Sequence, residues 1–547
     1  MPTGRPNVLL LMADQLRHDA LGCAGSPTAR TPNLDRLAAE GTRFSQAVTP
    51  TPICMAARYS LLTGRRAKET GVTANGGPGG SDAPTPLWPT LMTCLNDAAY
   101  TTRGVGKFHF GRRPFGFQHQ ELMEECIDCL AHDDYLKHLQ AAGVPTRFPQ
   151  GLRDLLYYQP QTSGVPEERS QNRWVADRSN AFLEEHAAYD GGRPFFLWSS
   201  WIAPHPPFAP VEPWDDLFDP DDMPPPVYAD RPLESLPAPA RAHRGRLDGA
   251  HEDPPRMRRI AALYHGQVAH LDACVGSVLG RLDALGLAEN TLVLFLSDHG
   301  EMLGDHGLSQ KNTPYEASVR IPLIARWPGR VPAGAVDDRL ACLTDVLPTV
   351  LDAADPPFPA PAPAPGSLPP LPGASLLAPA PEREAHVIDF GHDDQRWVCR
   401  RSAEKKYVFW ASGGREEAYD LAADPEERDN LAEHADPPAW VAEWRAATLA
   451  WERDFGLGER STDAAGFRVW PEPPLDAAAR AAAAGRVEVN DGRWADRLPP
   501  GHPHPVESAA EAFDRAVSKE TTLSPGKLSV DAYLAAGGSL DGTVWAR

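Results

Sequence analysis

Cys54 and Arg58 form the first pair of residues whose types and spacing could do chemistry. A proline-containing loop leads into Cys54-Met55-Ala56-Ala57-Arg58, which has the pattern of a helix start. Residues four apart share one face of a helix. A helix N-terminus and a nearby arginine both lower the pKa of a thiol and attract anions. The pair indicates a reactive cysteine beside an anion site, although a small buried cysteine beside a surface arginine gives the same pattern.

Acidic side chains and a histidine follow two short apolar runs. Asp14 directly follows Val8–Ala13, and Asp298 and His299 directly follow Phe295–Ser297. Open α/β sheets bind their ligands at the carboxyl ends of strands. Carboxylate oxygens and an imidazole nitrogen together suit a divalent metal ion. Each fragment alone could equally be an Asx turn or a helix cap, but the combination predicts a metal site.

Four other residues could bind an anion or transfer protons. Lys107 and His109 are two positions apart after a candidate strand, so both side chains can point to one side. His205 lies among three prolines, whose stiff backbone suits a positioned acid or base. Lys311 is a cation in a loop shortly after the Asp-His pair. These residues predict an anion-binding site that also contains proton-transfer groups.

In this order along the chain, the segments resemble the type I, formylglycine-dependent sulfatase family of the alkaline phosphatase superfamily. The resemblance covers about residues 5–432 and includes a closing signature over 417–431. Gln15 stands where the family usually has a second aspartate, and His299 where it usually has asparagine. Both changes resemble the branch that contains choline sulfatases and phosphonate monoester hydrolases. Ala56 replaces the proline of the usual C-x-P-x-R motif, giving C-x-A-x-R.

The resemblance implies that a formylglycine-generating enzyme oxidises Cys54 and that the hydrated aldehyde is the nucleophile. It also implies that Asp14, Asp298, His299 and the oxygen derived from Cys54 hold one divalent metal ion. Compared with the usual family site, this one has one carboxylate fewer and one imidazole more. This difference favours Mn²⁺ over pure Ca²⁺ chemistry, without excluding Ca²⁺ or Mg²⁺. Gln15 is a further candidate ligand through its carbonyl oxygen.

The resemblance further implies that Arg58, Lys107 and Lys311 bind the anion and the diol. We expect His205 to protonate the leaving alcohol and His109 to take the second diol proton. The predicted function is hydrolysis of sulfate monoesters, which are small anionic esters, through a covalent sulfo-enzyme. The alternative is phosphonate monoester or phosphodiester hydrolysis at the same site. A third candidate is a non-catalytic anion-binding protein in which the cysteine stays unmodified.

The elements that must position these residues alternate between short apolar runs and helical patterns. Buried strands are predicted over 7–13, 101–105, 194–201, 291–297 and 321–327. Helices are predicted over 32–40, 256–285, 344–354 and 438–454, and short strands over 386–390, 396–400 and 405–410. The buried runs lack the alternation of a half-exposed sheet, so helices should cover both faces. The predicted fold is α/β, with a large mixed, mostly parallel sheet sandwiched by helices, as in alkaline phosphatase, and a smaller C-terminal α+β subdomain.

A proline-rich stretch, 356–373, marks the predicted domain boundary. We expect an N-terminal catalytic domain over 1–373 and a small-sheet subdomain over 374–455. The remaining residues, 456–547, are poor in apolar periodicity. This predicts a tail that packs on the body or on a neighbouring subunit, and we expect a homo-oligomer.

Composition and charge limit the partners. Lys plus Arg is 53 and Asp plus Glu is 74, a net charge of −21, so the average surface repels nucleic acid. A local cationic pocket can still bind a small anion. No apolar run approaches the ~18 residues of a membrane span, and no secretory signal is recognisable. The eight cysteines are scattered, which fits a reducing compartment. Cys126-x-x-Cys129 has no second pair, which favours a packed helix face over a redox or zinc site. We therefore expect a cytoplasmic protein without membrane partners.

Overall fold

The structure of the protein is a computed structural model. It describes residues 5–75, 85–110, 113–125, 132–144, 149, 157–158, 160–189, 192–247, 249–354, 370–477, 479–480 and 521–523. Cys126 and Cys129, most of the proline-rich stretch and most of the predicted tail lie outside these residues.

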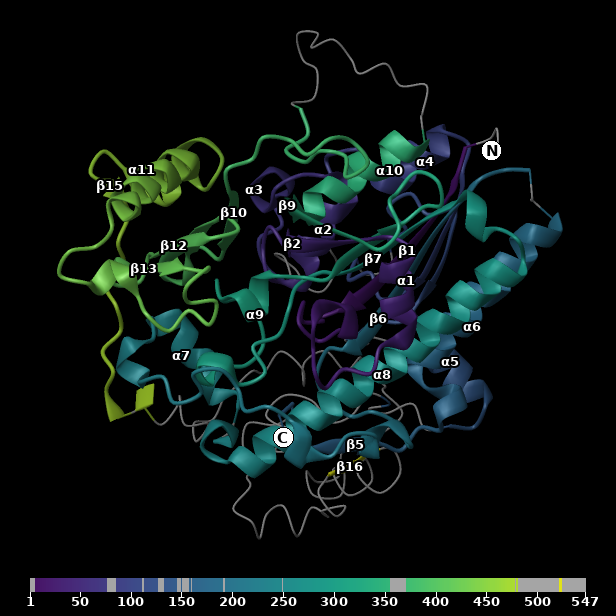
Figure 1. The fold of residues 1–547 in the computed structure, drawn as a ribbon, viewed down its shortest axis with the longest axis horizontal. Helices are drawn as coiled ribbons and strands as arrows, with labels where there is room; N and C mark the ends of the chain where they lie inside the picture. Colours follow the sequence, from purple (N-terminus) through teal and green to yellow (C-terminus); the bar gives the residue numbers. More distant parts are fainter. Residues whose placement is uncertain are drawn as a thin grey trace.

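A large sheet forms the centre of the protein (Figure 1). It has eight strands in the order β4-β3-β6-β1-β7-β8-β2-β9. The first five strands in this order run parallel, β8 is antiparallel to both of its neighbours, and β9 is parallel to β2. The strands are β1 (Asn7–Asp14), β2 (Thr42–Val48), β3 (Thr101–Gly106), β4 (His119–Leu122), β6 (Phe195–Pro204), β7 (Thr291–Ser297), β8 (Leu323–Arg326) and β9 (Ala335–Cys342). The prediction of a mixed, mostly parallel sheet is confirmed.

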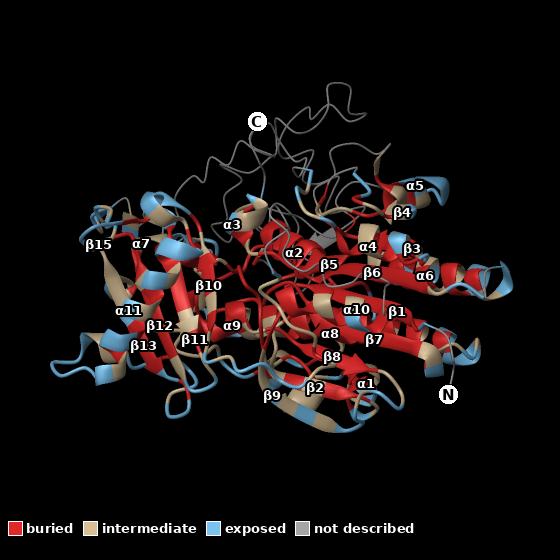
Figure 2. Ribbon diagram, turned by 90° about the horizontal axis from the view of Figure 1, so that it is seen from above, coloured by how far each residue is buried: buried red, intermediate tan, exposed pale blue. Residues whose placement is uncertain are grey.

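Helices cover both faces of this sheet, as the continuous apolar runs predict. Leu9 and Leu11 of β1 belong to one core cluster, with α1 (Pro32–Ala39), α6 (Gln171–Tyr189) and α8 (Pro254–Ala284). Leu10 and Met12 belong to the other, with α2 (Cys54–Thr63), α4 (Leu91–Asp97) and α10 (Val346–Ala354). Every residue of β1, β6 and β7 is buried (Figure 2). Alternate residues of a strand point to opposite faces, so a strand buried on both faces must be apolar throughout.

A second, antiparallel sheet follows the large one in the chain. Its strands are β10 (His386–Phe390), β11 (Trp397–Arg401), β12 (Lys405–Trp410) and β13 (Arg415–Asp420). The helix α11 (Ala439–Asp454) packs Val441 and Trp444 against Tyr407 and Phe409 of this sheet. This α+β unit confirms the predicted C-terminal subdomain. The strand β13 was not predicted, because its sequence, REEAYD, is too polar to give an apolar signal.

The remaining elements are short. They are α3 (Ala67–Thr70), α5 (Asp134–Ala141), β5 (Gln161–Ser163), α7 (Ala238–Gly245), α9 (Glu316–Val319), β14 (Thr462–Asp463), β15 (Gly466–Phe467) and β16 (Thr521–Leu523). β16 pairs antiparallel with β5, so this part of the tail lies against the body. Among the described residues, no helix combines the length and the apolar composition needed to cross a bilayer.

Candidate active site

Most of the predicted site residues come from the carboxyl ends of four strands and from the start of one helix, and Lys311 comes from the loop over 308–315. Asp14 ends β1, whereas Lys107, His205 and Asp298 directly follow β3, β6 and β7. These four strands are adjacent and parallel, so their carboxyl ends meet at one edge of the sheet. Cys54 is the first residue of α2, which places it at a helix N-terminus, as predicted.

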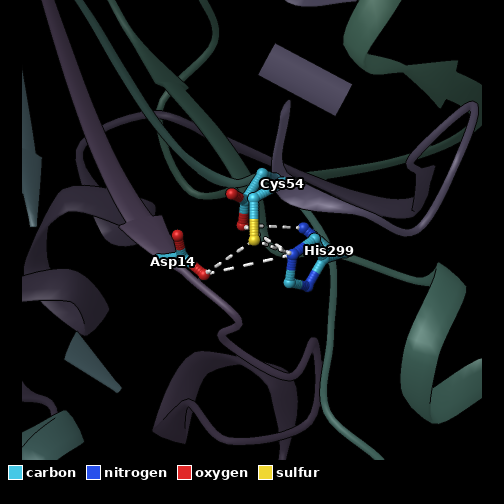
Figure 3. A group of neighbouring side chains, drawn as sticks. Asp14, Cys54 and His299 are labelled. Atoms are coloured by element: carbon cyan, nitrogen blue, oxygen red, sulfur yellow. Dashed lines mark hydrogen bonds and ion pairs between the residues drawn. The ribbon is translucent and has the colours of Figure 1, made fainter. Parts of the chain in front are cut away.

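Cys54 lies between Asp14 and His299 at the centre of the site (Figure 3). Its side chain is fully buried. Its Sγ lies 3.1 Å from His299 Nε2 and 3.8 Å from Asp14 Oδ1. The cysteine is therefore in contact with groups from two different strand ends.

A buried group of four side chains has the chemistry of a divalent metal site. One ligand atom from each of Asp14, Cys54, Asp298 and His299 lies within 4.8 Å of all the others. His299 Nδ1 lies 3.0 Å from the Gly300 carbonyl oxygen, which can only accept a hydrogen bond. Nδ1 therefore holds a proton, and Nε2 can present a lone pair to a metal ion when it is deprotonated. Two carboxylates and an imidazole fit a divalent ion, and an oxygen at the Cys54 position would complete the set.

Arg58 holds the two carboxylates in place. Its guanidinium donates to Asp298 Oδ2 at 2.9 Å and to Asp14 Oδ2 at 3.1 Å. It also donates to the Lys107 carbonyl oxygen at 2.6 Å and to Ser200 Oγ at 2.9 Å. A buried guanidinium is stable only when charge and hydrogen bonds compensate it, and here both conditions are met.

Lys107 and His205 share a carboxylate that the sequence analysis did not identify. Lys107 Nζ lies 2.5 Å from both Asp14 Oδ2 and Glu125 Oε2. His205 Nε2 lies 3.3 Å from Glu125 Oε1, and its Nδ1 lies 2.6 Å from the Pro206 carbonyl oxygen. Glu125 therefore bridges the lysine and the histidine.

Lys311 reaches the site through Gln15. Lys311 Nζ donates to Gln15 Oε1 at 2.5 Å, and Gln15 Nε2 donates to the buried carboxylate of Glu301. Glu301 also accepts from Tyr158 Oη at 2.9 Å and from two backbone amides at 2.8 Å. The carbonyl oxygen of Gln15 thus bonds the lysine, and its role as a metal ligand stays a prediction.

His109 lies half-buried beside the cysteine, in a left-handed backbone conformation with φ of 61°. Its Nδ1 has no hydrogen-bond partner among the described residues. A ring nitrogen lies within 4.8 Å of both Cys54 Sγ and a Glu125 oxygen. The backbone amide of His109 donates to Glu124 Oε1 at 2.9 Å, which fixes the position of the residue.

The charges of the site favour a thiolate at Cys54. Burial and Asp14 raise the pKa of this thiol. Lys311, Lys107 and His299 lower it, and the net pKa lies well below the ordinary value. The environment therefore stabilises a negative charge at this position.

The two carboxylates of the group have opposite pKa shifts. Burial raises the pKa of Asp14, but the charges of Lys107, His205, Arg58 and His299 bring it well below the usual value. Burial and the charge of Asp14 raise the pKa of Asp298. Two buried carboxylates this close repel each other, and a shared cation would relieve that repulsion.

The structure brings the nine predicted side chains together at this edge of the sheet. The sequence analysis missed Glu125, Ser200 and Glu301. Glu125 belongs to an acidic segment without a motif, and Ser200 lies inside a buried strand. Glu301 follows the Asp-His pair by two residues, and that closeness was the only signal it offered.

Comparison with known proteins identifies the family. The sequence model of the family described as Sulfatase matches residues 6–356. A second model, described as N-sulphoglucosamine sulphohydrolase, C-terminal, matches residues 304–445. The two matches together extend over both sheets.

Individual proteins give the same result. An arylsulfatase of Clostridium perfringens is 30% identical over 456 residues, which cover 78% of this chain and 90% of that protein. A choline-sulfatase of Rhizobium meliloti is 28% identical, over 96% of this chain and 99% of that protein. The crystal structure of a phosphonate monoester hydrolase of Agrobacterium radiobacter has the same fold. Its TM-score is 0.67 at 24% identity, over 86% of this chain and 100% of that one. The chain thus belongs to the sulfatase family of the alkaline phosphatase superfamily, and is a sulfuric ester hydrolase.

Proposed function

We propose that the protein hydrolyses sulfate monoesters with a formylglycine derived from Cys54 as the nucleophile, through a covalent sulfo-enzyme. The observation that carries this proposal is the position of Cys54 Sγ, 3.1 Å from His299 Nε2 and 3.8 Å from Asp14 Oδ1. A nucleophile derived from Cys54 would lie within the group of metal-type ligands. No other described cysteine belongs to such a group.

Asp14, Asp298, His299 and the Cys54-derived oxygen would hold one divalent ion, for which we propose Mn²⁺ or Ca²⁺, with Mg²⁺ as a further candidate. Such an ion lowers the pKa of a bound hydroxyl and offsets the charge of an anionic substrate. The protein contributes the fixed geometry, because Arg58 clamps both carboxylates. This clamp restricts the carboxylates to the orientation that faces the cysteine.

Lys107 and Lys311 are proposed to bind the non-bridging oxygens of the ester. Both ammonium groups are buried, and buried cations bind an anion more strongly than solvated ones. They would orient the ester so that its sulfur faces the nucleophile and its leaving oxygen faces His205. This assignment depends on the charge and position of the two side chains.

His205 is proposed to protonate the leaving alcohol, and His109 to take the proton of the second hydroxyl of the hydrated aldehyde. Loss of that proton forms the C=O bond of the aldehyde and breaks the carbon–oxygen bond to the ester, so that sulfate leaves with that oxygen. Nδ1 of His109 has no hydrogen-bond partner among the residues that the structure describes, which supports its role as an acceptor. Burial lowers the pKa of His205 well below its ordinary value, and the Glu125 carboxylate that faces its Nε2 opposes this shift.

Maturation must precede folding. Cys54 is fully buried, and every residue of α2 is buried with it. A formylglycine-generating enzyme could not reach this side chain in the folded chain. We therefore propose that the oxidase acts on the extended segment during synthesis, with Ala56 tolerated at the position of the usual proline.

Peptide mapping combined with activity measurement tests the proposal. The protein, produced together with a formylglycine-generating enzyme, should contain the aldehyde at position 54 in proportion to its turnover of phenyl sulfate. Cys54→Ala is the control and should have no activity above background. Fully active protein containing only unmodified Cys54 would refute the proposal. Phenyl phosphonate monoesters and phosphodiesters, which also have one negative charge, belong in the same assay as the second candidate substrates.

A further inference from the structure

Glu125 is a carboxylate that faces the reacting groups from outside the group of Asp14, Cys54, Asp298 and His299. With Cys54 and His109 it forms a second group whose potential ligand atoms lie within 4.8 Å of one another. Its side chain is 9% exposed, with Oε2 2.5 Å from Lys107 Nζ and Oε1 3.3 Å from His205 Nε2. One of its oxygens also lies within 4.8 Å of Cys54 Sγ. The carboxylate therefore lies next to the nucleophile position, one proposed anion-binding lysine and the proposed acid.

The positive charges around this carboxylate are already shared. Lys107 contacts both Asp14 and Glu125, and Arg58 contacts both Asp14 and Asp298. Lys311, in contrast, donates to the neutral amide of Gln15. Within the part of the chain that the structure describes, Arg58 and Lys107 are thus each paired with two carboxylates, and Lys311 bonds a neutral group.

We propose that Glu125 is a specificity-determining residue that makes the site select singly charged esters over doubly charged ones. The singly charged class contains sulfate monoesters, phosphonate monoesters and phosphodiesters, and the doubly charged class contains phosphate monoesters. The inference rests on the proposed ester hydrolysis at Cys54. Its physical basis is repulsion, because a second negative charge on the ester would lie close to a buried carboxylate.

The size of the effect follows from Coulomb's law. For unit charges about 5 Å apart in a partly buried site, the repulsion corresponds to a discrimination of about 10- to 100-fold. A carboxylate that only orients His205 would affect esters of both charges equally. The dependence on ligand charge therefore separates selectivity from positioning.

Binding of two matched anions tests the inference without turnover. Sulfate and methanesulfonate are both tetrahedral sulfur oxyanions, with fixed charges of two and one near neutral pH. Calorimetric titrations of the metal-loaded protein measure the affinity for each anion. The Glu125→Gln substitution should strengthen the binding of sulfate relative to that of methanesulfonate by about 10- to 100-fold. Glu125→Asp, which keeps the charge, should stay near the wild-type ratio. Glu125→Ala provides a second neutral variant should the glutamine disturb folding.

Glu124→Gln is the matched control. Glu124 accepts hydrogen bonds from the backbone amides of Phe108 and His109, which a glutamine oxygen can still accept. Burial raises the pKa of Glu124, which opposes its ionisation. The control should leave the ratio of the two affinities unchanged. An unchanged ratio in folded, metal-loaded Glu125→Gln, or an equal shift in Glu124→Gln, would overturn the inference.

Turnover of phenyl sulfate and phenyl phosphate by the matured protein gives the second test. The ratio of their kcat/KM values should shift towards the phosphate by a similar factor in Glu125→Gln. If the wild type hydrolyses no ester of either class, the proposed function fails, while the anion titrations still test Glu125. If the wild type hydrolyses phenyl sulfate but the ratio does not shift in the variant, only the selectivity role fails.

Discussion

At the scale of single residues, the site is a set of buried charges that compensate one another. The carboxylate of Asp14, for example, contacts three of these groups: Arg58, Lys107 and Cys54. Because each charge is buried, removing one partner leaves another without compensation. Substitutions here should therefore change metal binding and catalysis more than they change the hydrophobic core.

The metal-type ligands should be individually essential. Asp298→Ala removes a carboxylate from the buried group, so the remaining ligands should hold a divalent ion much more weakly. We expect a loss of bound metal, measured by elemental analysis after dialysis, and a parallel loss of sulfate ester hydrolysis. Asp305→Asn, at a buried carboxylate that pairs with Arg17, is the control and should keep its metal. Full activity of the wild type after verified metal removal would contradict the site assignment.

His205 should matter most for esters with poor leaving groups. An alkoxide needs a proton to leave, whereas a nitrophenolate does not, and general acid catalysis contributes about 10²–10⁴-fold. We expect His205→Ala to slow alkyl sulfates by about this factor and nitrophenyl sulfate much less. Equal losses across a leaving-group series would instead mean that His205 only binds the ester.

The pH dependence should report the same histidine. Burial lowers the pKa of His205, Glu125 raises it, and Lys311 and Lys107 lower it, leaving it well below the ordinary value in the free protein. A bound anion would raise this pKa, because it adds a negative charge beside the ring. The acid form is lost as the pH rises, so kcat/KM should fall at a lower pH than kcat. His205→Ala should remove this difference between the two profiles.

At the scale of elements, the loop that contains Lys311 depends on the second sheet. Trp397 Nε1 of β11 donates to the Asn312 carbonyl oxygen at 2.9 Å, and Lys406 Nζ of β12 donates to the Pro314 carbonyl oxygen at 2.8 Å. The C-terminal unit thus fixes a loop of the active site. Residues of the second sheet, which are distant in sequence from the first strands, thus help to form the active site.

Removing one of these contacts should weaken substrate binding. Trp397→Phe loses the hydrogen bond to Asn312, which should let the loop with Lys311 move away from Gln15. We expect a several-fold rise in KM for phenyl sulfate with unchanged metal content. The free energy of unfolding should also fall by about 1–3 kcal/mol. Trp440→Phe, on the outer helix α11, is the control and should leave KM unchanged. An unchanged KM in Trp397→Phe would show that the loop holds its position without this contact.

The elements that place the site could largely be predicted from sequence. The strands β1, β6 and β7 are buried and mostly apolar, and β3 is buried over its last three residues. Polar residues follow each of them directly. The strand β9 at one edge of the sheet has alternating exposure, and β2 beside it is half-polar, so neither gave a sufficient signal. Glu125 could not be predicted, because only the packing of β4 beside β3 brings it to Lys107.

At the scale of the whole molecule, a buried ionic network joins the two sheets. Glu316, the first residue of α9, contacts Arg401 and Lys406 of the second sheet at 2.8 and 2.7 Å. Lys406 also contacts Glu427 at 2.6 Å. Because charges from both parts compensate one another, separating the parts would expose unpaired buried charges. The two sheets should therefore unfold together.

Two neighbouring lysines allow a matched test of this coupling. Lys406→Met leaves Glu316 and Glu427 with less compensation, and should lower the free energy of unfolding by about 3–5 kcal/mol. Lys405→Met replaces a partly exposed lysine that lies over the Trp440 ring. This substitution should lower the free energy of unfolding by less than about 1 kcal/mol. Denaturant unfolding measures both values. Equal effects of the two substitutions would contradict the role of the network.

The central claim is that the group derived from Cys54 attacks the ester and becomes sulfated. Cys54→Ser tests it most directly, because a serine oxygen can form the sulfo-enzyme but has no second hydroxyl to expel the sulfate. After incubation of metal-loaded Cys54→Ser with phenyl sulfate, mass analysis should find one sulfo group on the peptide that contains residue 54. Phenol release should then stop after about one equivalent. Sustained multiple turnover by Cys54→Ser, with residue 54 unmodified, would contradict the account.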